Sequence, residues 1–176
     1  MEAMSVSDLH GLRLAILSNA IELTDEAEIL VAHQRWARAF LLAHFAIEEM
    51  GKIPMVVGII GRIMKGEPVD WRKTRRRLSD HKAKISSQNM HFYMFGLDID
   101  LLRDSDLEWL KDADGRVGDS YQFKNAATYV DSRENSPSTP ATAITQDMAE
   151  HLVAFAGRCV QSHLISERLT NPAYPK

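Results

Sequence analysis

The chain has 176 residues, of which 45% are hydrophobic and 26% are charged, a balance typical of one soluble globular domain with a sizeable core. Its net charge of -3 excludes a global attraction to nucleic acid, so any such binding must depend on a local basic patch. The lone cysteine excludes an intramolecular disulfide, and the apolar runs are too short to span a membrane, so we expect a cytoplasmic protein with one domain over residues 1–176.

The first half of the chain predicts two long helices. Apolar residues recur at every third or fourth position from Leu9 to Leu30, which indicates an amphipathic helix that Ser5 or Ser7 can cap. The stretch from Gln34 to Ile53 is apolar on nearly every side, as expected for a buried central helix. Pro54 lacks an amide hydrogen, so this second helix should end or bend there before a helical continuation to about residue 65.

Two adjacent carboxylates, Glu48 and Glu49, follow the apolar part of the central helix. A buried ionised carboxylate without a partner costs several kcal/mol, so both need cations. Lys52 is the nearest cation along the helix. Gly51 has no side chain and therefore allows a neighbouring backbone to approach the same turn.

A third helix is predicted from about Asp70 to Gly96, where apolar residues follow a seven-residue repeat. The inward positions of this repeat are Trp71, Thr74, Leu78, His81, Ile85, Gln88, Phe92, Phe95 and Ile99. The outward positions are strongly basic, and they hold Arg72, Lys73, Arg75, Arg76, Arg77, Lys82 and Lys84 against one acid, Asp80. Because like charges three and four residues apart repel, we expect an anion from outside this helix to compensate them.

The segment from Asp98 to Asp119 is rich in acids and contains one short predicted helix, from Ser105 to Ala113. Residues 123–131 are ambiguous and include a possible extended piece, and residues 132–143 read as a loop. A last helix should begin at the cap Thr145 and end before Pro172. The predicted fold is an all-α bundle of four to five helices with one long irregular connection before the last helix.

Metal and thiol chemistry find little support in the sequence. A di-iron helical bundle needs Glu-x-x-His on two helices, which this chain lacks, and His44 is more simply a hydrogen-bonded helix histidine. Cys159 lies on the apolar stripe of the last helix and reads as a small core residue. We therefore expect neither a metal nor a cofactor.

An acid–base constellation remains. Its candidate catalytic residues are Glu48, Glu49, Lys52, Arg76, Arg77, His81 and Lys84. Histidine moves protons near neutral pH and arginine matches a phosphate, so the set suits metal-independent cleavage of RNA, with His81 as general acid or base. In the alternative interpretation the two acids pair with Lys52 and one cation of the third helix, and they only fix the register of the bundle.

The order of these motifs resembles that of the AbiV family of bacterial abortive-infection proteins, which belong to the HEPN superfamily. The resemblance covers about residues 10 to 160 and comprises Ala39–Lys52 with its Glu-Glu-x-Gly-Lys ending, His81-x-x-Lys84 in a basic helix, Tyr129-Val130-Asp131 and a last helix. It implies a HEPN-like helical bundle, usually a homodimer, that acts in phage defence, senses a phage-encoded protein and blocks translation.

Many HEPN proteins are metal-independent ribonucleases with an arginine, four to six residues and then a histidine. Arg76 and Arg75 both meet this spacing to His81. On a regular helix, however, Arg76 and His81 would point about 140° apart, whereas Arg77 would share the face of His81.

Two further interpretations stay open. The protein could be a non-catalytic module whose basic helix binds a phage protein, RNA or a nucleotide. The basic helix could also meet the acidic segment 98–119 of a second copy and form a homodimer, which is compatible with either function.

Overall fold

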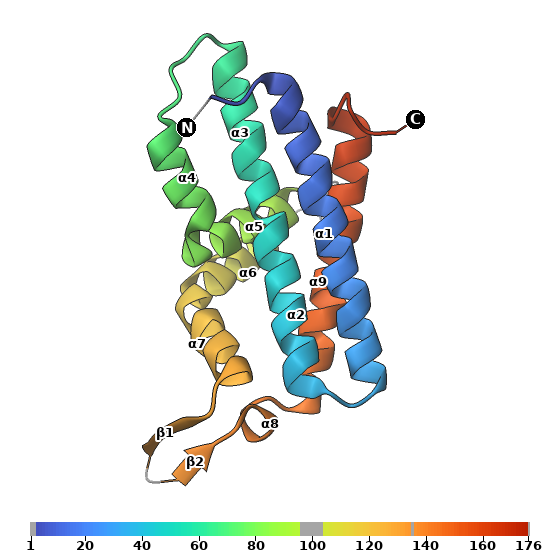
Figure 1. Ribbon diagram of the computed structural model, residues 1–176, viewed down its shortest axis with the longest axis vertical. Coiled ribbons are helices and arrows are strands. Elements are labelled where there is room, and N and C mark those ends of the chain that lie inside the picture. The colour runs from blue at the N-terminus through green and yellow to red at the C-terminus, as the bar shows by residue number, and fades with distance from the viewer. Residues whose placement is uncertain (1–2, 96–103, 135, 176) are drawn as a thin grey trace.

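Three helical columns run side by side along the long axis of the molecule (Figure 1). The computed structural model describes residues 3–95, 104–134 and 136–175. The columns are α1 (Val6–Ala32), the stacked pair α2 (Trp36–Met50) and α3 (Lys52–Met64), and α9 (Gln146–Thr170). This central bundle confirms the predicted all-α class and the helix boundaries expected near Pro54 and Thr145.

Local sequence explains where these helices begin. Ser5 caps α1 through a capping box, in which its side chain accepts from the Asp8 amide and the Asp8 carboxylate accepts from the Ser5 amide. Thr145 caps α9 by accepting from the Met148 amide. Both caps satisfy amide groups that have no partner within the helix, as the sequence predicted.

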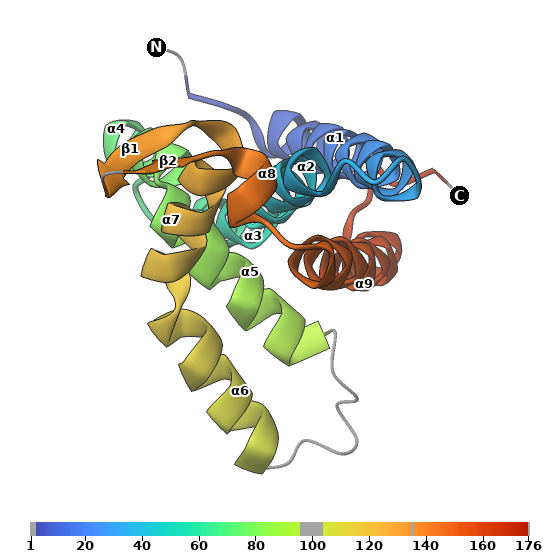
Figure 2. The same ribbon diagram turned by 90° about the horizontal axis from the view of Figure 1, so that it is seen from below.

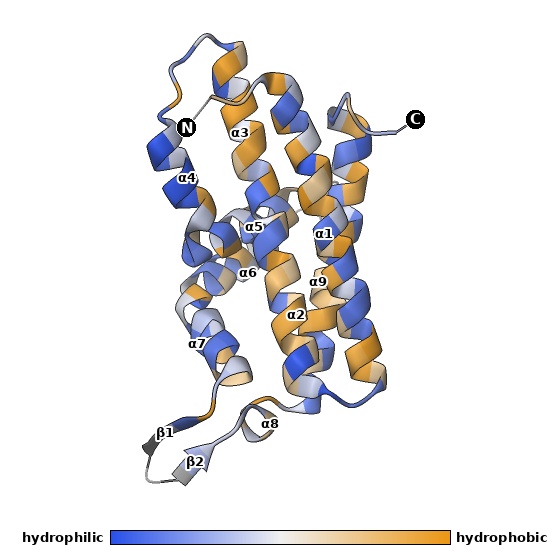
Figure 3. Cartoon of the chain, viewed as in Figure 1, coloured by the Kyte–Doolittle hydropathy of each residue, from blue (hydrophilic) through white to orange (hydrophobic). Residues whose placement is uncertain are grey.

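Small residues allow the columns to pack closely. Ala27, Ala39, Ala43 and Ala156 are completely buried where α1, α2 and α9 meet. A second cluster of larger apolar side chains, including Leu9 and Val56, joins the start of α1 to α3. Figure 3 shows many hydrophobic residues along α3 and the central columns, whereas most residues of α4 are hydrophilic. None of the described helices has the length and apolar character needed to cross a bilayer.

The predicted helix over residues 70–96 is broken into two. α4 (Trp71–Ser79) ends at Asp80, whose backbone is extended, and α5 (His81–Phe95) starts immediately afterwards. The Asp80 carboxylate accepts from the Ala83 amide and so caps the new helix, because aspartate favours helix starts over helix interiors. The expectation of one continuous helix was therefore wrong.

The break changes which positions of the seven-residue repeat face inward. Ile85, Gln88 and Phe92 are buried as predicted. Phe95 is 53% exposed, so its predicted inward position was wrong, and Ile99 lies outside the described residues. His81 becomes the first residue of α5 instead of the middle of a long helix.

The connection before α9 is more regular than predicted. α6 (Asp104–Gly115) contains the expected short helix, and α7 (Val117–Thr128) follows after one residue. The two short strands β1 (Asp131–Glu134) and β2 (Ser136–Ser138) pair antiparallel, and α8 (Pro140–Ala143) leads into α9. The described residues thus form more helices than the four to five expected, and Figure 2 shows α5 and α6 projecting from the central columns.

Buried polar contacts tie the ends of the bundle together. The Arg13 guanidinium on α1 donates to Glu167 Oε1 on α9 through Nε at 2.9 Å and Nη2 at 2.6 Å, and both side chains are buried. Asn171 donates to the second Glu167 oxygen at 2.7 Å. Because its residues are 154 positions apart, this pair was not predicted from the sequence.

A pair of stacked imidazoles joins α5 to α9. The rings of His91 and His163 lie 3.7 Å apart with an angle of 3° between their planes, and His163 Nε2 lies 2.8 Å from Gln88 Oε1. Burial lowers the pKa of His91 to about 4 and the pKa of His163 well below its ordinary value. Both rings are therefore neutral at pH 7, which permits two histidines to stack without charge repulsion.

Gly51 allows the backbone of α5 to approach the α2–α3 column closely. A Cβ at this position would lie 2.7 Å from the carbonyl carbon of Lys84 and nearer still to its oxygen. The expected role of Gly51 in admitting a neighbouring backbone is thus confirmed. This contact fixes the position along α2 at which the first turn of α5 packs.

Gly51→Ala is expected to lower the free energy of unfolding by about 1–3 kcal/mol, because the added methyl group forces the first turn of α5 outward. Gly58→Ala is the matched control, since a Cβ there meets nothing within 4 Å and alanine favours a helix by about 0.5–1 kcal/mol. Urea unfolding of both variants checks this. Equal or greater stability of Gly51→Ala than of the wild type would contradict the close approach.

Candidate functional site

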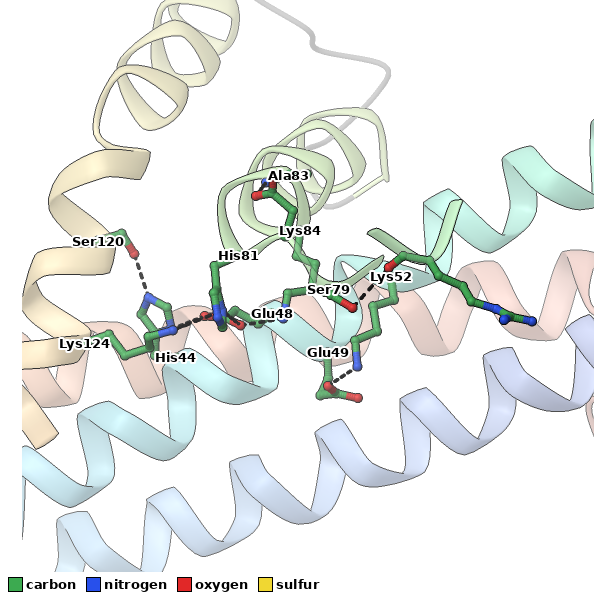
Figure 4. A network of polar contacts seen from close by, with 12 residues as sticks. His44, Glu48, Glu49, Lys52, Ser79, His81, Ala83, Lys84, Ser120 and Lys124 are labelled. Atoms are coloured by element: carbon green, nitrogen blue, oxygen red, sulfur yellow. Dashed lines mark hydrogen bonds and ion pairs between the residues drawn. The ribbon is translucent and has the colours of Figure 1, made fainter. Parts of the chain in front are cut away.

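Glu48, in the last turn of α2, is the centre of a buried charge cluster (Figure 4). Its carboxylate is 3% exposed. Oε2 lies 2.6 Å from His81 Nδ1 and accepts from Lys84 Nζ at 2.7 Å, while Oε1 accepts from Lys124 Nζ at 2.9 Å. Three helices, α2, α5 and α7, therefore contribute side chains to one acid.

Helix geometry brings these partners together. His81 and Lys84 are three residues apart, so both project from one face of the first turn of α5. The close contact of this turn with Gly51 holds that face over Glu48. Lys124 approaches from α7, and its Nζ also lies 3.1 Å from His81 Nδ1.

The cluster carries more positive than negative charge. Among the described ion pairs, Lys84 and Lys124 are both buried, at 6% and 7% exposure, and they share the carboxylate of Glu48. Burial by itself would raise the pKa of Glu48, but the nearby His44 ring and hydrogen bonds from Lys84, Lys124 and His81 outweigh it and hold that pKa well below its ordinary value. Glu48 is thus ionised, and the surplus charge favours an anion nearby.

His44 forms a side branch of the cluster. Its Nδ1 lies 3.3 Å from Glu48 Oε1, and its Nε2 lies 2.9 Å from Ser120 Oγ on α7. This confirms the interpretation of His44 as a hydrogen-bonded helix histidine. Within the described ranges, no three histidine, cysteine or acidic side chains are grouped to hold a metal ion.

His81 connects the buried cluster to the surface. Its side chain is 46% exposed, and its Nδ1 faces Glu48. A pocket of about 480 Å³ adjoins the ring and is lined by Arg76, Ser79, Asp80, His81, Lys82 and Tyr121. The ring of Tyr121 lies 5.8 Å from the imidazole. One histidine therefore touches both a buried carboxylate and an open pocket with two cations on its wall.

The break at Asp80 decides which arginine reaches this pocket. The sequence placed Arg76 and His81 on different faces of a regular helix and Arg77 on the face of His81. Because the two residues sit on separate helices, Arg76 lines the pocket with His81. Arg77 is exposed and is not among the lining residues, so the expected sharing of a face by Arg77 and His81 was wrong.

Glu49 and Lys52 do not join the cluster. They form an ion pair with each other and line a different pocket of about 610 Å³, against α1 and α4. Successive helix residues point about 100° apart, so two adjacent acids cannot face one site. The expectation that both acids converge with His81 is wrong for Glu49, as Figure 4 shows. Arg75 lines the Glu49 pocket and not that of His81.

α7 supplies Lys124, Ser120 and Tyr121, a contribution that was not predicted from the sequence. Residues 123–131 were ambiguous, so no partner was expected from them. Their apolar residues follow no clear period, and no sequence signal marks Lys124 as buried.

Comparison with protein-family models gives one finding that bears on this site. The model described as AbiV, a HEPN family, matches residues 8–161 and so includes Glu48, His81 and Lys124. Comparisons with curated proteins and with solved structures give no match.

Proposed function

Because the chain belongs to the AbiV family of HEPN-type proteins of bacterial abortive infection, we propose that it cleaves RNA without a metal ion, in the pocket between Arg76 and His81. The observation that carries this proposal is the position of His81, between a buried ionised carboxylate and an open basic pocket. Phage defence through damage to RNA would stop translation in the infected cell.

Glu48 orients His81 for proton transfer. At 2.6 Å, the acceptor Glu48 Oε2 favours the tautomer with a proton on Nδ1, which leaves Nε2 as a base on the opposite side of the ring. Nε2 would take the proton of an RNA 2′-hydroxyl as its oxygen attacks the adjacent phosphorus. The imidazolium that forms is stabilised by Glu48, and the 5′-oxygen departs toward solvent, where water protonates it.

Arg76 and the surplus positive charge would bind the phosphate. Negative charge grows on the phosphoryl oxygens during attack, and a guanidinium can donate two parallel hydrogen bonds to them. Lys84 and Lys124 are held by Glu48 and add a fixed positive field beneath the pocket. In this mechanism the lysines stabilise charge from a distance, and they do not exchange protons with RNA.

A second candidate is phosphate recognition without cleavage. It is favoured by the surplus positive charge of Lys84 and Lys124 at Glu48, which would attract a phosphate whether or not RNA is cleaved. The occupant would then be RNA, a nucleotide or a phage-encoded protein with phosphate-like charge. The expected homodimer, and its contact through the acidic segment that begins at residue 98, stays a prediction, since residues 98–103 lie outside the described ranges.

Arg76→Ala is expected to slow RNA cleavage about 10- to 100-fold, because it removes one charge-assisted contact to the phosphate. Arg77→Ala, on the same helix but outside the pocket, should retain nearly full activity. The assay is cleavage of total RNA by the purified protein in EDTA, with and without extract from phage-infected cells, read as fragments with 2′,3′-cyclic phosphate ends.

Three results decide between the candidates. Cleavage in EDTA that depends on Arg76 and not on Arg77 supports the ribonuclease. Binding of RNA without cleavage in any extract supports the recognition module and removes the enzyme. Equal losses for both arginine variants would show that α4 attracts RNA only through its total charge.

A further inference from the structure

A larger hollow lies beside the His81 pocket, between α7 and the start of β1. Its volume is about 780 Å³, and it is lined by Tyr121, Gln122, Asn125, Ala126, Tyr129, Val130 and Asp131. We propose that this hollow is a subsite for an unpaired nucleobase of single-stranded RNA. The inference rests on the proposed function, because it names the form of RNA that the His81 pocket would receive.

Tyr121 is shared by this hollow and the His81 pocket, so the two adjoin each other. It lines both of them, and its ring lies 5.8 Å from the His81 imidazole. Lys124 Nζ is 4.9 Å from the centre of the Tyr121 ring, which fixes the ring by a cation–π contact from its buried side. A nucleotide whose phosphate sits at Arg76 and His81 would therefore have its base within reach of Tyr121.

The spacing along α7 gives this hollow one continuous wall. Tyr121, Asn125 and Tyr129 are four residues apart, so they lie above one another on one face of the helix and its C-terminal cap. Lys124 lies one turn after Tyr121, and its Nζ reaches Glu48 while it contacts the Tyr121 ring. α7 thus serves the acid–base cluster through Lys124 and the hollow through its tyrosines, and Tyr121 adjoins both.

The chemistry of the lining suits a base better than a phosphate. Tyr129 is 67% exposed and Tyr121 is 39% exposed, so two large rings are available for stacking. The Gln122 and Asn125 amides offer both donors and acceptors, as the edges of bases require. No lysine or arginine is among the lining residues of this hollow. Phosphate and base therefore have separate, adjoining places.

Stacking on protein aromatic rings requires a base that is out of a duplex. Bases in an RNA helix are already stacked on their neighbours, whereas loops and single strands present their faces to tyrosine. The structure therefore assigns single-stranded RNA, and not duplex RNA, as the substrate class. A peptide from a phage protein is the competing occupant, and it would leave RNA binding independent of Tyr121 and Tyr129.

The whole chain with His81→Ala, which is expected to bind RNA with little cleavage, is the parent for the test. Its affinity is measured by fluorescence anisotropy with a labelled single strand of about ten nucleotides, the matching duplex, and an abasic strand with the same phosphates. Adding Tyr121→Ala and Tyr129→Ala is expected to weaken single-strand binding at least about tenfold, since each stacked base contributes substantially. Binding of the abasic strand should not change.

Two control variants show that aromatic rings at these positions are responsible. Tyr121→Phe with Tyr129→Phe keeps both rings and should keep the affinity of the parent. Phe123→Ala removes a ring that is 44% exposed on α7 but lines neither hollow, and it too should bind as the parent does. Because the substituted side chains are exposed, circular dichroism melts should match those of the parent.

The outcomes separate this inference from the proposed function. Unchanged single-strand binding by the double alanine variant, or equal weakening for the single and abasic strands, overturns the base subsite even if the wild type cleaves RNA. Base-dependent binding in a wild type that never cleaves RNA keeps the subsite and removes the ribonuclease.

Discussion

His81→Ala is expected to reduce RNA cleavage by about 100- to 10,000-fold, the usual contribution of a positioned general acid or base. The variant removes the group that links Glu48 to the open pocket. It leaves Glu48 paired with both lysines, and the substituted side chain is 46% exposed, so the fold should persist with little change in stability. Activity and stability are thus expected to respond very differently to this substitution.

The measurement is the cleavage rate in EDTA, together with a urea unfolding curve for the same preparation. His33→Ala is a matched control, because His33 is an exposed histidine at the end of α1, outside the cluster. Added imidazole should restore part of the lost rate if the defect is a missing proton acceptor. Cleavage by His81→Ala at the wild-type rate would remove His81 from the mechanism.

Much of the charge cluster could be predicted because burial restricts what an acid can do. The apolar stretch before Glu48 indicated a buried helix end, and a buried carboxylate requires cations. His81 and Lys84 lay on a basic helix with Asp80 as its one acid, so that helix needed anions and Glu48 needed cations. The structure brings these three residues together as expected, but it buries Lys84, which the seven-residue repeat had placed outward.

The break at Asp80 was harder to predict, since the seven-residue repeat continued through it. Aspartate tolerates a helix interior but caps a helix start more favourably, and the sequence gives no measure of which tendency prevails. The gain from seating Lys84 against Gly51 and Glu48 depends on distant contacts. Tertiary contacts therefore determine the helix break at Asp80. The break in turn places Arg76, and not Arg77, in the wall of the His81 pocket.

The role of α7 illustrates a different limit. Its sequence mixes apolar and polar residues without a clear period, because it buries Lys124 and Ala127 on one side and exposes two tyrosine-lined surfaces on the other. A helix that serves a functional site on two faces lacks the simple apolar stripe on which periodicity depends. The weak pattern of residues 123–131 was itself a consequence of this double role.

The surplus positive charge of Lys84 and Lys124 affects both the stability of the fold and the proposed chemistry. Two buried ammonium groups and one carboxylate cost more free energy than an apolar core would, and the described ion pairs place no second acid on either lysine. Such an arrangement is retained at a functional site when the field that it creates acts on a substrate. Glu48 then has two tasks, since it keeps the lysines folded inward and orients His81.

Glu48→Gln is expected to lower the free energy of unfolding by about 3–5 kcal/mol, because it leaves Lys84 and Lys124 buried without a counter-charge. Glu49→Gln is the matched control, since Glu49 is 22% exposed and pairs with Lys52 near the surface, where an ion pair contributes about 0–1 kcal/mol. Urea unfolding at pH 7 measures both. Equal effects of the two substitutions would contradict the central place of Glu48.

The pH dependence of this difference gives a second measurement. The folded state holds the pKa of Glu48 below its ordinary value of 4.5, so its stabilising effect is complete above that value and is lost as the pH falls further. The difference in free energy of unfolding between the wild type and Glu48→Gln should therefore shrink below about pH 4.5, by roughly 1.4 kcal/mol per pH unit.

Replacing Lys84 and Lys124 by methionine in the Glu48→Gln chain should restore stability, because no unpaired buried charge remains. Stability without RNA cleavage in that variant would separate the two tasks of Glu48.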